Sequence, residues 1–258
     1  MATSGILAGK KIVITGVLTD ASLAFGVAQI AQREGASIIL TGAGRGLSIT
    51  ERTARKLDQA AEVIEFDVTV PEHVESAREA TRQRLGSVDG VLHSIGFAPA
   101  SCLGDDLMAA PWQDVAVAME VSAFSLKTLA DAFVPLMTSG GSFVGLDFDN
   151  TVAWPAYNWM GVAKAALEAT NRYLARDLGA KGIRCNLVAA GPIRTMAAKS
   201  IPTFAKFEDV WSERAPLGWN ILDSEPVARA CVALLSDWFP ATTGEIIHVD
   251  GGFHAVGV

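Results

Sequence analysis

Residues 153–182, AWPAYNWMGVAKAALEATNRYLARDLGAKG, are the stretch around which the rest of the chain is arranged. Pro155 suits a first helical turn, and the alanine- and leucine-rich residues after it predict one long helix. Seven positions along a helix return to nearly the same face, about 10 Å further on. Tyr157 and Lys164 are therefore expected to point into one groove. A phenol and an ammonium on an apolar face indicate a polar ligand; the alternative is a half-buried tyrosine beside a lysine that extends to solvent.

Strands and helices alternate on both sides of this stretch. Short β-branched or apolar runs predict strands at 11–15, 37–40, 62–66, 90–93, 142–146, 184–188 and 245–249, and helical patterns lie at 21–34, 47–57, 72–85, 112–137 and 227–235. Strands that are apolar on both faces and alternate with helices predict an α/β fold, a single-domain Rossmann-type doubly wound parallel sheet flanked by helices. No linker or repeat divides residues 1–258. The irregular segment 194–220 is expected to be a long functional loop.

The composition excludes several classes of protein. Of 258 residues, 50% are hydrophobic and 19% charged, which is typical of a globular chain, and the net charge of −7 argues against a nucleic-acid partner. Cys102, Cys185 and Cys231 are far apart, without disulfide or zinc spacing, as expected of reduced thiols in a cytoplasm. The first strand leaves no room for a signal peptide, and charges interrupt the apolar segment 115–137. We expect a cytoplasmic protein with no membrane partner and no metal.

The predicted strand ends are small or polar, and ligands of open parallel sheets bind beyond the carboxyl ends of strands. The ends comprise Gly16 and Ser22 after the first strand, Ala43 after the second, Asp67 and Val68 after the third, Ser94, Ile95 and Gly96 after the fourth, and Ala190, Gly191, Pro192, Ile193 and Thr195 after the sixth. A G-x-G-x-x-G pattern is absent, and Ser22 and Asp67 have ordinary alternatives as a helix cap and a turn residue. Five such ends in succession nevertheless predict a dinucleotide lying across them, with its pyrophosphate at the helix that Ser22 opens.

Seven motifs resemble those of the short-chain dehydrogenase/reductases and, among these, the NAD(P)-dependent enoyl-acyl-carrier-protein reductases. They are G-x5-S-x-A from Gly16, HSIGF at 93–97, PAYNWM at 155–160, NLVAAGPIRT at 186–195, LLSDW at 234–238, TTGEI at 242–246 and VDGG at 249–252. The likeness is greatest to the actinobacterial branch, which includes the mycobacterial isoniazid target. The superfamily's main branch has Tyr-x3-Lys and a serine ending the fifth strand. Here the spacing is Tyr-x6-Lys and that strand ends in Asp147 and Phe148, which implies double-bond rather than ketone reduction.

The resemblance implies reduction of the trans-2 double bond of enoyl thioesters by hydride from NADH in fatty-acid elongation. Tyr157 would donate a hydrogen bond to the enolate oxygen, Lys164 would hold the nicotinamide ribose, and Phe148 would close the pocket. Cofactor contacts are implied for Gly16, Ser22, Leu23, Ala43, Asp67, Val68, Ser94, Ile95, Gly96, Lys164, Ala190, Gly191, Pro192, Ile193 and Thr195. Substrate contacts are implied for Phe97, Tyr157, Met160, Met196, Ile201 and Phe204. The expected substrate partner is an acyl-carrier-protein or coenzyme A thioester.

Several alternatives stay open. Arg45 favours NADPH if it pairs with a 2′-phosphate, or NADH if it only lies along the adenosine. The same site would serve a specialised acyl or polyketide pathway, and a non-catalytic dinucleotide sensor is the competing class; an intact Tyr157, Lys164 and Phe148 favours an enzyme. The resemblance also implies a homotetramer, for which the apolar helices at 112–137 and 156–178 would supply interfaces.

Overall fold

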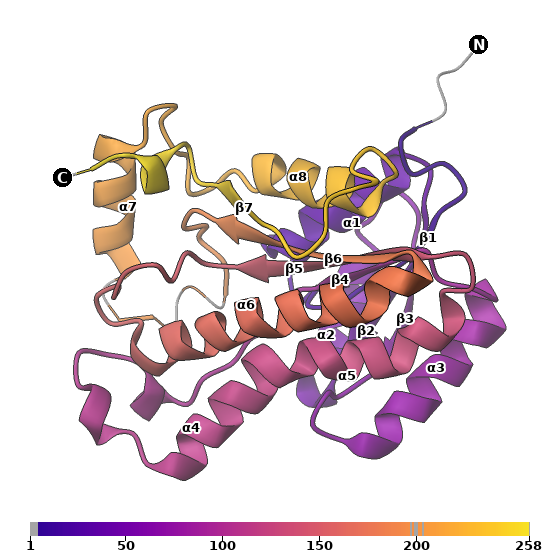
Figure 1. Ribbon diagram of the computed structural model, residues 1–258, viewed down its shortest axis with the longest axis horizontal. Helices are drawn as coiled ribbons and strands as arrows, with labels where there is room; N and C mark the ends of the chain where they lie inside the picture. Colours follow the sequence, from indigo (N-terminus) through magenta and orange to yellow (C-terminus); the bar gives the residue numbers. More distant parts are fainter. Residues whose placement is uncertain (1–4, 197, 199–200, 203, 258) are drawn as a thin grey trace.

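The computed structural model describes residues 5–196, 198, 201–202 and 204–257. A parallel sheet of seven strands forms its centre, in the order β3-β2-β1-β4-β5-β6-β7 (Figure 1). The strands are β1 (Lys11–Ile14), β2 (Ser37–Gly42), β3 (Glu62–Glu65), β4 (Gly90–His93), β5 (Gly141–Asp147), β6 (Ile183–Ala190) and β7 (Ile246–Val249). The predicted doubly wound parallel sheet is confirmed. Its order reverses between β1 and β4, and a crevice opens at the carboxyl ends of strands where this happens.

Helices cover both faces of the sheet. The α-helices are α1 (Leu23–Arg33), α2 (Gly44–Ala54), α3 (Pro71–Leu85), α4 (Trp112–Met119), α5 (Ser125–Phe133), α6 (Asn158–Leu178), α7 (Phe204–Arg214) and α8 (Glu225–Leu235). Shorter turns are the π-helical η3 (Glu120–Phe124) and the 3-10 segments η1 (Ala100–Cys102), η2 (Leu107–Ala109), η4 (Val134–Leu136), η5 (Gly179–Lys181) and η7 (Phe253–Ala255). Helices α3, α5 and α6 form one layer, and α1 and α8 form the other (Figure 1).

Side chains that alternate along the strands form two hydrophobic cores, one on each face of the sheet. Along β1, Ile12 and Ile14 pack toward α1 and α8, whereas Val13 packs toward α3 and α5, and all three are fully buried. Successive strand residues point to opposite faces, so a strand in the middle of the sheet must be apolar throughout. Each such side chain contributes about 1.5–3 kcal/mol on burial. The two apolar layers hold the strand ends rigidly at one edge.

The long helix begins later than predicted. Helix α6 starts at Asn158 and not near Ala153, Pro155 lies in the turn before it, and Tyr157 is the N-cap residue. Ala156 and Asn158 have positive φ angles of 61° and 50°, so the chain turns sharply on either side of Tyr157. Such backbone costs about 1–3 kcal/mol per residue and persists where surrounding packing enforces it. Nothing in an alanine signals that conformation beforehand.

Two other segments differ from the prediction. The single helix expected at 112–137 is interrupted by η3, which shifts the register between α4 and α5. The segment 194–220, expected to be a loop, contains α7. None of the helices within the described residues combines the length and the apolarity needed to cross a bilayer.

Candidate active site

A cavity of about 1150 Å³ lies at the carboxyl ends of the strands and is lined by segments from β1 to α7. The structure brings together in its wall all the residues that the sequence singled out for cofactor or substrate. They are Gly16, Ser22, Leu23, Ala43, Asp67, Val68, Ser94, Ile95, Gly96, Phe97, Phe148, Tyr157, Met160, Lys164, Ala190, Gly191, Pro192, Ile193, Thr195, Met196, Ile201 and Phe204. Residues from strands far apart in the sequence therefore share one cavity.

The floor of the crevice is formed where β1 and β4 approach each other. Gly16 has a φ of +80°, and a Cβ atom there would lie 1.9 Å from the carbonyl oxygen of Ser94. The Thr15 hydroxyl joins the two strands, donating to the Leu92 carbonyl at 2.9 Å and accepting from the Ser94 amide at 2.9 Å. Only glycine permits this backbone and this approach, which leaves the crevice shallow and open to a flat ligand.

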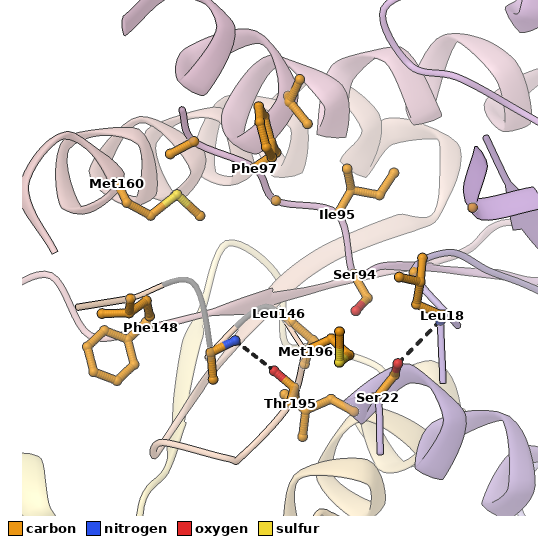
Figure 2. Close-up of a pocket in the computed structure, with 18 of the residues that line it drawn as sticks. Leu18, Ser22, Ser94, Ile95, Phe97, Leu146, Phe148, Met160, Thr195 and Met196 are labelled. Carbon is orange, nitrogen blue, oxygen red and sulfur yellow. Dashed lines mark hydrogen bonds between the residues drawn. The ribbon is translucent and has the colours of Figure 1, made fainter. Parts of the chain in front are cut away.

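The start of α1 has the features of an anion site. The Ser22 hydroxyl accepts from the amides of Leu18 at 3.2 Å and Thr19 at 3.0 Å (Figure 2). Ser22 occupies the N-cap position of α1, but its side chain makes no capping hydrogen bond to the helix, so it is not an ordinary side-chain cap. The first-turn amides of α1 are left without a side-chain acceptor, and together with the helix dipole they suit a phosphate group.

The end of the crevice beyond β2 and β3 carries one acidic and one basic side chain. The Asp67 carboxylate accepts from the Thr69 amide at 3.0 Å and from its hydroxyl at 2.7 Å. Asp67 is thus a turn residue and a wall of the cavity at the same time. Arg45, in the first turn of α2, also lines the cavity. The carboxylate of Asp67 and the guanidinium of Arg45 therefore set the charge at this end of the crevice.

A buried phenol stands at the other end of the crevice. Tyr157 is 6% exposed, and its ring lies 5.1 Å from that of Phe148, centroid to centroid. Phe148 packs in turn against Trp154, Phe207 and Trp211. Burial, and to a smaller extent the negative charge of Asp147, raises the pKa of Tyr157 well above its usual value. The phenol therefore stays neutral and can donate a hydrogen bond.

Lys164 is buried beside the same space. Its Nζ donates to the Leu146 carbonyl at 2.8 Å and lies 3.9 Å from Oδ1 of Asp147. Burial lowers the pKa of Lys164, and Asp147 opposes this shift. Burial also raises the pKa of Asp147 to about 7, with Lys164 opposing. Tyr157 and Lys164 both line the cavity, as the seven-residue spacing predicts, and the alternative of a lysine that extends to solvent is wrong.

Apolar side chains line the part of the cavity away from the crevice. Behind the lining residue Phe97, the buried hydroxyl of Ser122 in η3 accepts from the Phe97 amide and donates to the Phe97 carbonyl, both at 2.9 Å. Phe97 and Met160 lie on one side and Phe148 on the other (Figure 2). Ile201 and Phe204 also pack against the aromatic cluster of α7. Ala197, which the sequence pattern places on the same apolar face, lies outside the described residues.

The sequence did not single out part of the lining. These residues include Leu18, Ile49, Thr50, Thr69, Ala98, Leu103, Val117, Val121, Leu146 and Asp147. The sequence does contain a clue to Asp147, since this residue is a carboxylate at the end of a predicted strand. Nothing in the sequence distinguishes Val117 and Val121 from other apolar residues of the segment 112–137, and the direction of Val121 depends on the π-helical turn η3 that contains it. In the described part of the chain, no group of His, Cys, Asp and Glu is placed to hold a metal ion.

Comparison with known proteins agrees with this geometry. A family model described as enoyl-(acyl carrier protein) reductase matches residues 16–254. The enoyl-[acyl-carrier-protein] reductase [NADH] of Mycolicibacterium smegmatis is 47% identical over 96% of this chain and 97% of its own length. Its counterpart in Mycobacterium avium is 45% identical over 96% and 97%. An NADPH-dependent enzyme of that name from Staphylococcus aureus is 39% identical over 97% and 98%.

The family model and the relatives cover nearly the whole chain, including every strand end that lines the cavity. The resemblance drawn from seven short motifs is therefore confirmed over the full length. This chain belongs to the enoyl-(acyl carrier protein) reductase family.

Proposed function

We propose that this chain reduces the trans-2 double bond of enoyl thioesters carried by acyl-carrier protein, with hydride from NADH, in fatty-acid elongation. The observation that carries the proposal is one cavity in which a crevice suited to a dinucleotide meets an apolar chamber at a buried phenol. The glycine floor at Gly16 and the uncapped start of α1 fit a nicotinamide dinucleotide. Family membership and the named relatives support the same reaction.

Tyr157 is proposed to stabilise the charge that develops on the substrate. When bound, NADH would supply the hydride for the β-carbon of the substrate. Negative charge would then develop on the thioester oxygen, two carbons away, until the α-carbon takes up a proton and the double bond is fully reduced. A neutral phenol held against Phe148 donates a hydrogen bond to that oxygen. A preorganised donor of this kind in a dry site contributes about 2–4 kcal/mol.

Lys164 is proposed to hold the cofactor and Phe148 to shield the phenol, and neither side chain touches the reacting oxygen. The ammonium of Lys164 is held against the Leu146 carbonyl and has further N–H groups for the ribose hydroxyls of the cofactor. Phe148 and the rings behind it exclude water from the phenol. We infer that residues 1–258 act as one dinucleotide-binding and catalytic domain, with the segment 194–220 as the cover of the substrate; cavity-lining residues from Gly16 to Phe207 support this.

We also propose NADH rather than NADPH, and a homotetramer. The two mycobacterial relatives are named for NADH and the staphylococcal one for NADPH, so family membership alone does not decide the cofactor. The carboxylate of Asp67 in the crevice disfavours a 2′-phosphate. Trp112, Phe124 and Tyr173 are 70%, 55% and 62% exposed on α4, η3 and α6, and such apolar surfaces favour contact with further copies of the chain.

Oxidation of NADH in the presence of a trans-2-enoyl thioester tests the reaction. The purified chain should oxidise NADH with an enoyl-acyl-carrier protein and, more slowly, with the matching coenzyme A thioester. A β-ketoacyl thioester should give no oxidation if the tyrosine is placed for double-bond reduction. A chain that binds NADH but oxidises it with neither enoyl thioester would instead be a sensor of the dinucleotide.

A further inference from the structure

Asp147, the last residue of β5, is a buried carboxylate that the proposed reaction does not use. Its side chain is 0% exposed, and neither carboxylate oxygen has a hydrogen-bond partner within the described residues. Burying a carboxylate without donors is costly, so the fold needs a compensating charge near it. Among the residues described, the nearest cation is Lys164, whose Nζ lies 3.9 Å from Oδ1.

Few other charges surround this lysine. From β4, His93 faces the lysine but is neutral near pH 7, because burial, and next the charge of Lys164, lowers its pKa to about 3. Glu168 lies one turn further along α6 and is held by the Asn150 amide and by Arg172 at 3.5 Å. Tyr157 stays neutral. Asp147 is therefore the carboxylate of this group whose oxygens accept no hydrogen bond in the described part of the chain, and the nearby charge of Glu168 adds to the rise in its pKa that burial causes.

We propose that Asp147 is a positioning residue, whose negative charge keeps Lys164 protonated and directed at the cavity so that the ammonium can hold the ribose of NADH. The proposal rests on the proposed function. A separation of 3.9 Å is too long for a hydrogen bond, so Asp147 acts through its charge. The Leu146 carbonyl fixes one N–H of the ammonium, and the carboxylate opposes loss of its proton.

The pH dependence of NADH binding separates this role from simple packing. A carboxylate within about 4–6 Å raises the pKa of a lysine by about 1–3 units. Since burial raises the pKa of Asp147 to about 7, its charge is present mainly above that pH, where a buried lysine is at risk of losing its proton. Removing the charge should therefore matter little in weakly acidic solution and increasingly as the pH rises.

Titration of NADH fluorescence from about pH 6 to about pH 10 tests the proposal on the wild type and Asp147→Asn. Without the carboxylate, Lys164 loses its proton at a lower pH. The NADH affinity of Asp147→Asn should therefore begin to fall at a pH at least about one unit below that of the wild type. Affinity at the acid end should match the wild type. Asp147→Glu, which keeps the charge, should stay near the wild-type profile. Asp149→Asn is the matched control, because that carboxylate accepts from Thr151 and lies 3.9 Å from His248.

Variants of Lys164 complete the test. Arginine stays charged throughout this pH range. Lys164→Arg should therefore abolish the loss of NADH affinity at alkaline pH, both alone and combined with Asp147→Asn. In a Lys164→Ala background, Asp147→Asn should change NADH affinity no further. A uniform loss at all pH values, or an added loss in that background, would show a structural role and overturn the proposal. If Asp147→Asn does not fold, Asp147→Ser removes the charge with a smaller side chain. A wild type that fails to bind NADH contradicts the proposed function instead.

Discussion

Tyr157 is held by unusual backbone on both sides. Ala156 and Asn158 adopt positive φ angles, and the ring between them is buried against Phe148. The sequence predicted which residues line the cavity, because small or polar strand ends and the spacing between tyrosine and lysine can be recognised without a structure. It did not predict the turn, because an alanine has no preference for the left-handed region. Packing around the phenol imposes that conformation.

The division of labour between Tyr157 and Lys164 gives a prediction for two substitutions. Tyr157→Phe removes one hydrogen bond to the developing charge, so turnover should fall by about 10²–10³-fold while NADH binding is kept. Lys164→Ala should instead weaken NADH binding. Equilibrium titration of NADH with both variants measures this. Loss of NADH binding in the tyrosine variant alone would reverse the two roles.

His93 predicts a pH dependence of folding stability. Burial lowers its pKa in the folded chain to about 3, below the value of about 6.5 in an unfolded chain. The stabilisation is therefore complete above about pH 6.5 and is lost as the pH falls toward 3. Between about pH 7 and pH 5 the wild type should lose about 2 kcal/mol of unfolding free energy from this group. Urea unfolding of His93→Gln should show a flatter dependence; identical slopes would contradict the argument.

Arg45 and Asp67 predict the choice of cofactor. A 2′-phosphate in the crevice would meet the arginine favourably but would be repelled by the carboxylate. A misplaced charge costs about 1–3 kcal/mol, so kcat/KM should favour NADH by about one to two orders of magnitude. Arg45→Ala should lower the remaining activity with NADPH more than that with NADH. Comparable kcat/KM values for both cofactors in the wild type would defeat the prediction.

At the scale of elements, strands were predictable and interruptions of helices were not. Apolar runs marked all seven strands to within a few residues at their ends, because a buried parallel strand needs such a run. The π-helical η3 was not predicted, because one extra residue in a helical turn leaves the spacing of apolar residues nearly unchanged. Yet η3 places Ser122, which fixes the backbone of Phe97. A feature that the sequence does not reveal therefore shapes the wall of the cavity around Phe97.

Helix α7 and the residues before it predict chain-length preference. Ile201, Phe204 and Phe207 line the cavity, and each substrate methylene that they cover contributes about 0.8 kcal/mol. Only twenty residues lie between Thr195 and Pro216, so this covering segment can enclose a limited length of acyl chain. The kcat/KM should therefore rise from C4 to about C8–C12 thioesters and then flatten or fall. Assays over a series of enoyl thioesters measure this.

Phe204→Ala should flatten that rise if the ring covers the acyl chain. Phe239→Ala is the control, since this partly exposed ring lies outside the cavity wall. A steep rise that continues beyond about C16 would show that the substrate tail finds cover elsewhere. An unchanged series in Phe204→Ala would remove that residue from the substrate site.

For the whole molecule, alternation of strands and helices determined the sheet, and the sheet brought the site together. The order of the strands could not be read from the sequence, because each strand is apolar on both faces and would fit several neighbours. Because β1 lies beside β4, Gly16 and Ser94 meet in one crevice.

The outer surface of α6 is unusually apolar. Val162 and Tyr173 are 41% and 62% exposed on α6, where a solvent-facing helix is normally polar.

The outer face of α6 predicts how copies of the chain assemble. Val162, Ala165 and Tyr173 are exposed on this helix, with the small Ala169 between them, so a helix of another copy could approach closely. The wild type should have about four times the chain mass of 27.1 kDa in sedimentation equilibrium. Tyr173→Asp would bury a charge without a partner in that contact and should yield smaller species. Ser76→Asp adds the same charge to the exposed face of α3 and should leave the mass unchanged. A monomeric wild type would refute the tetramer.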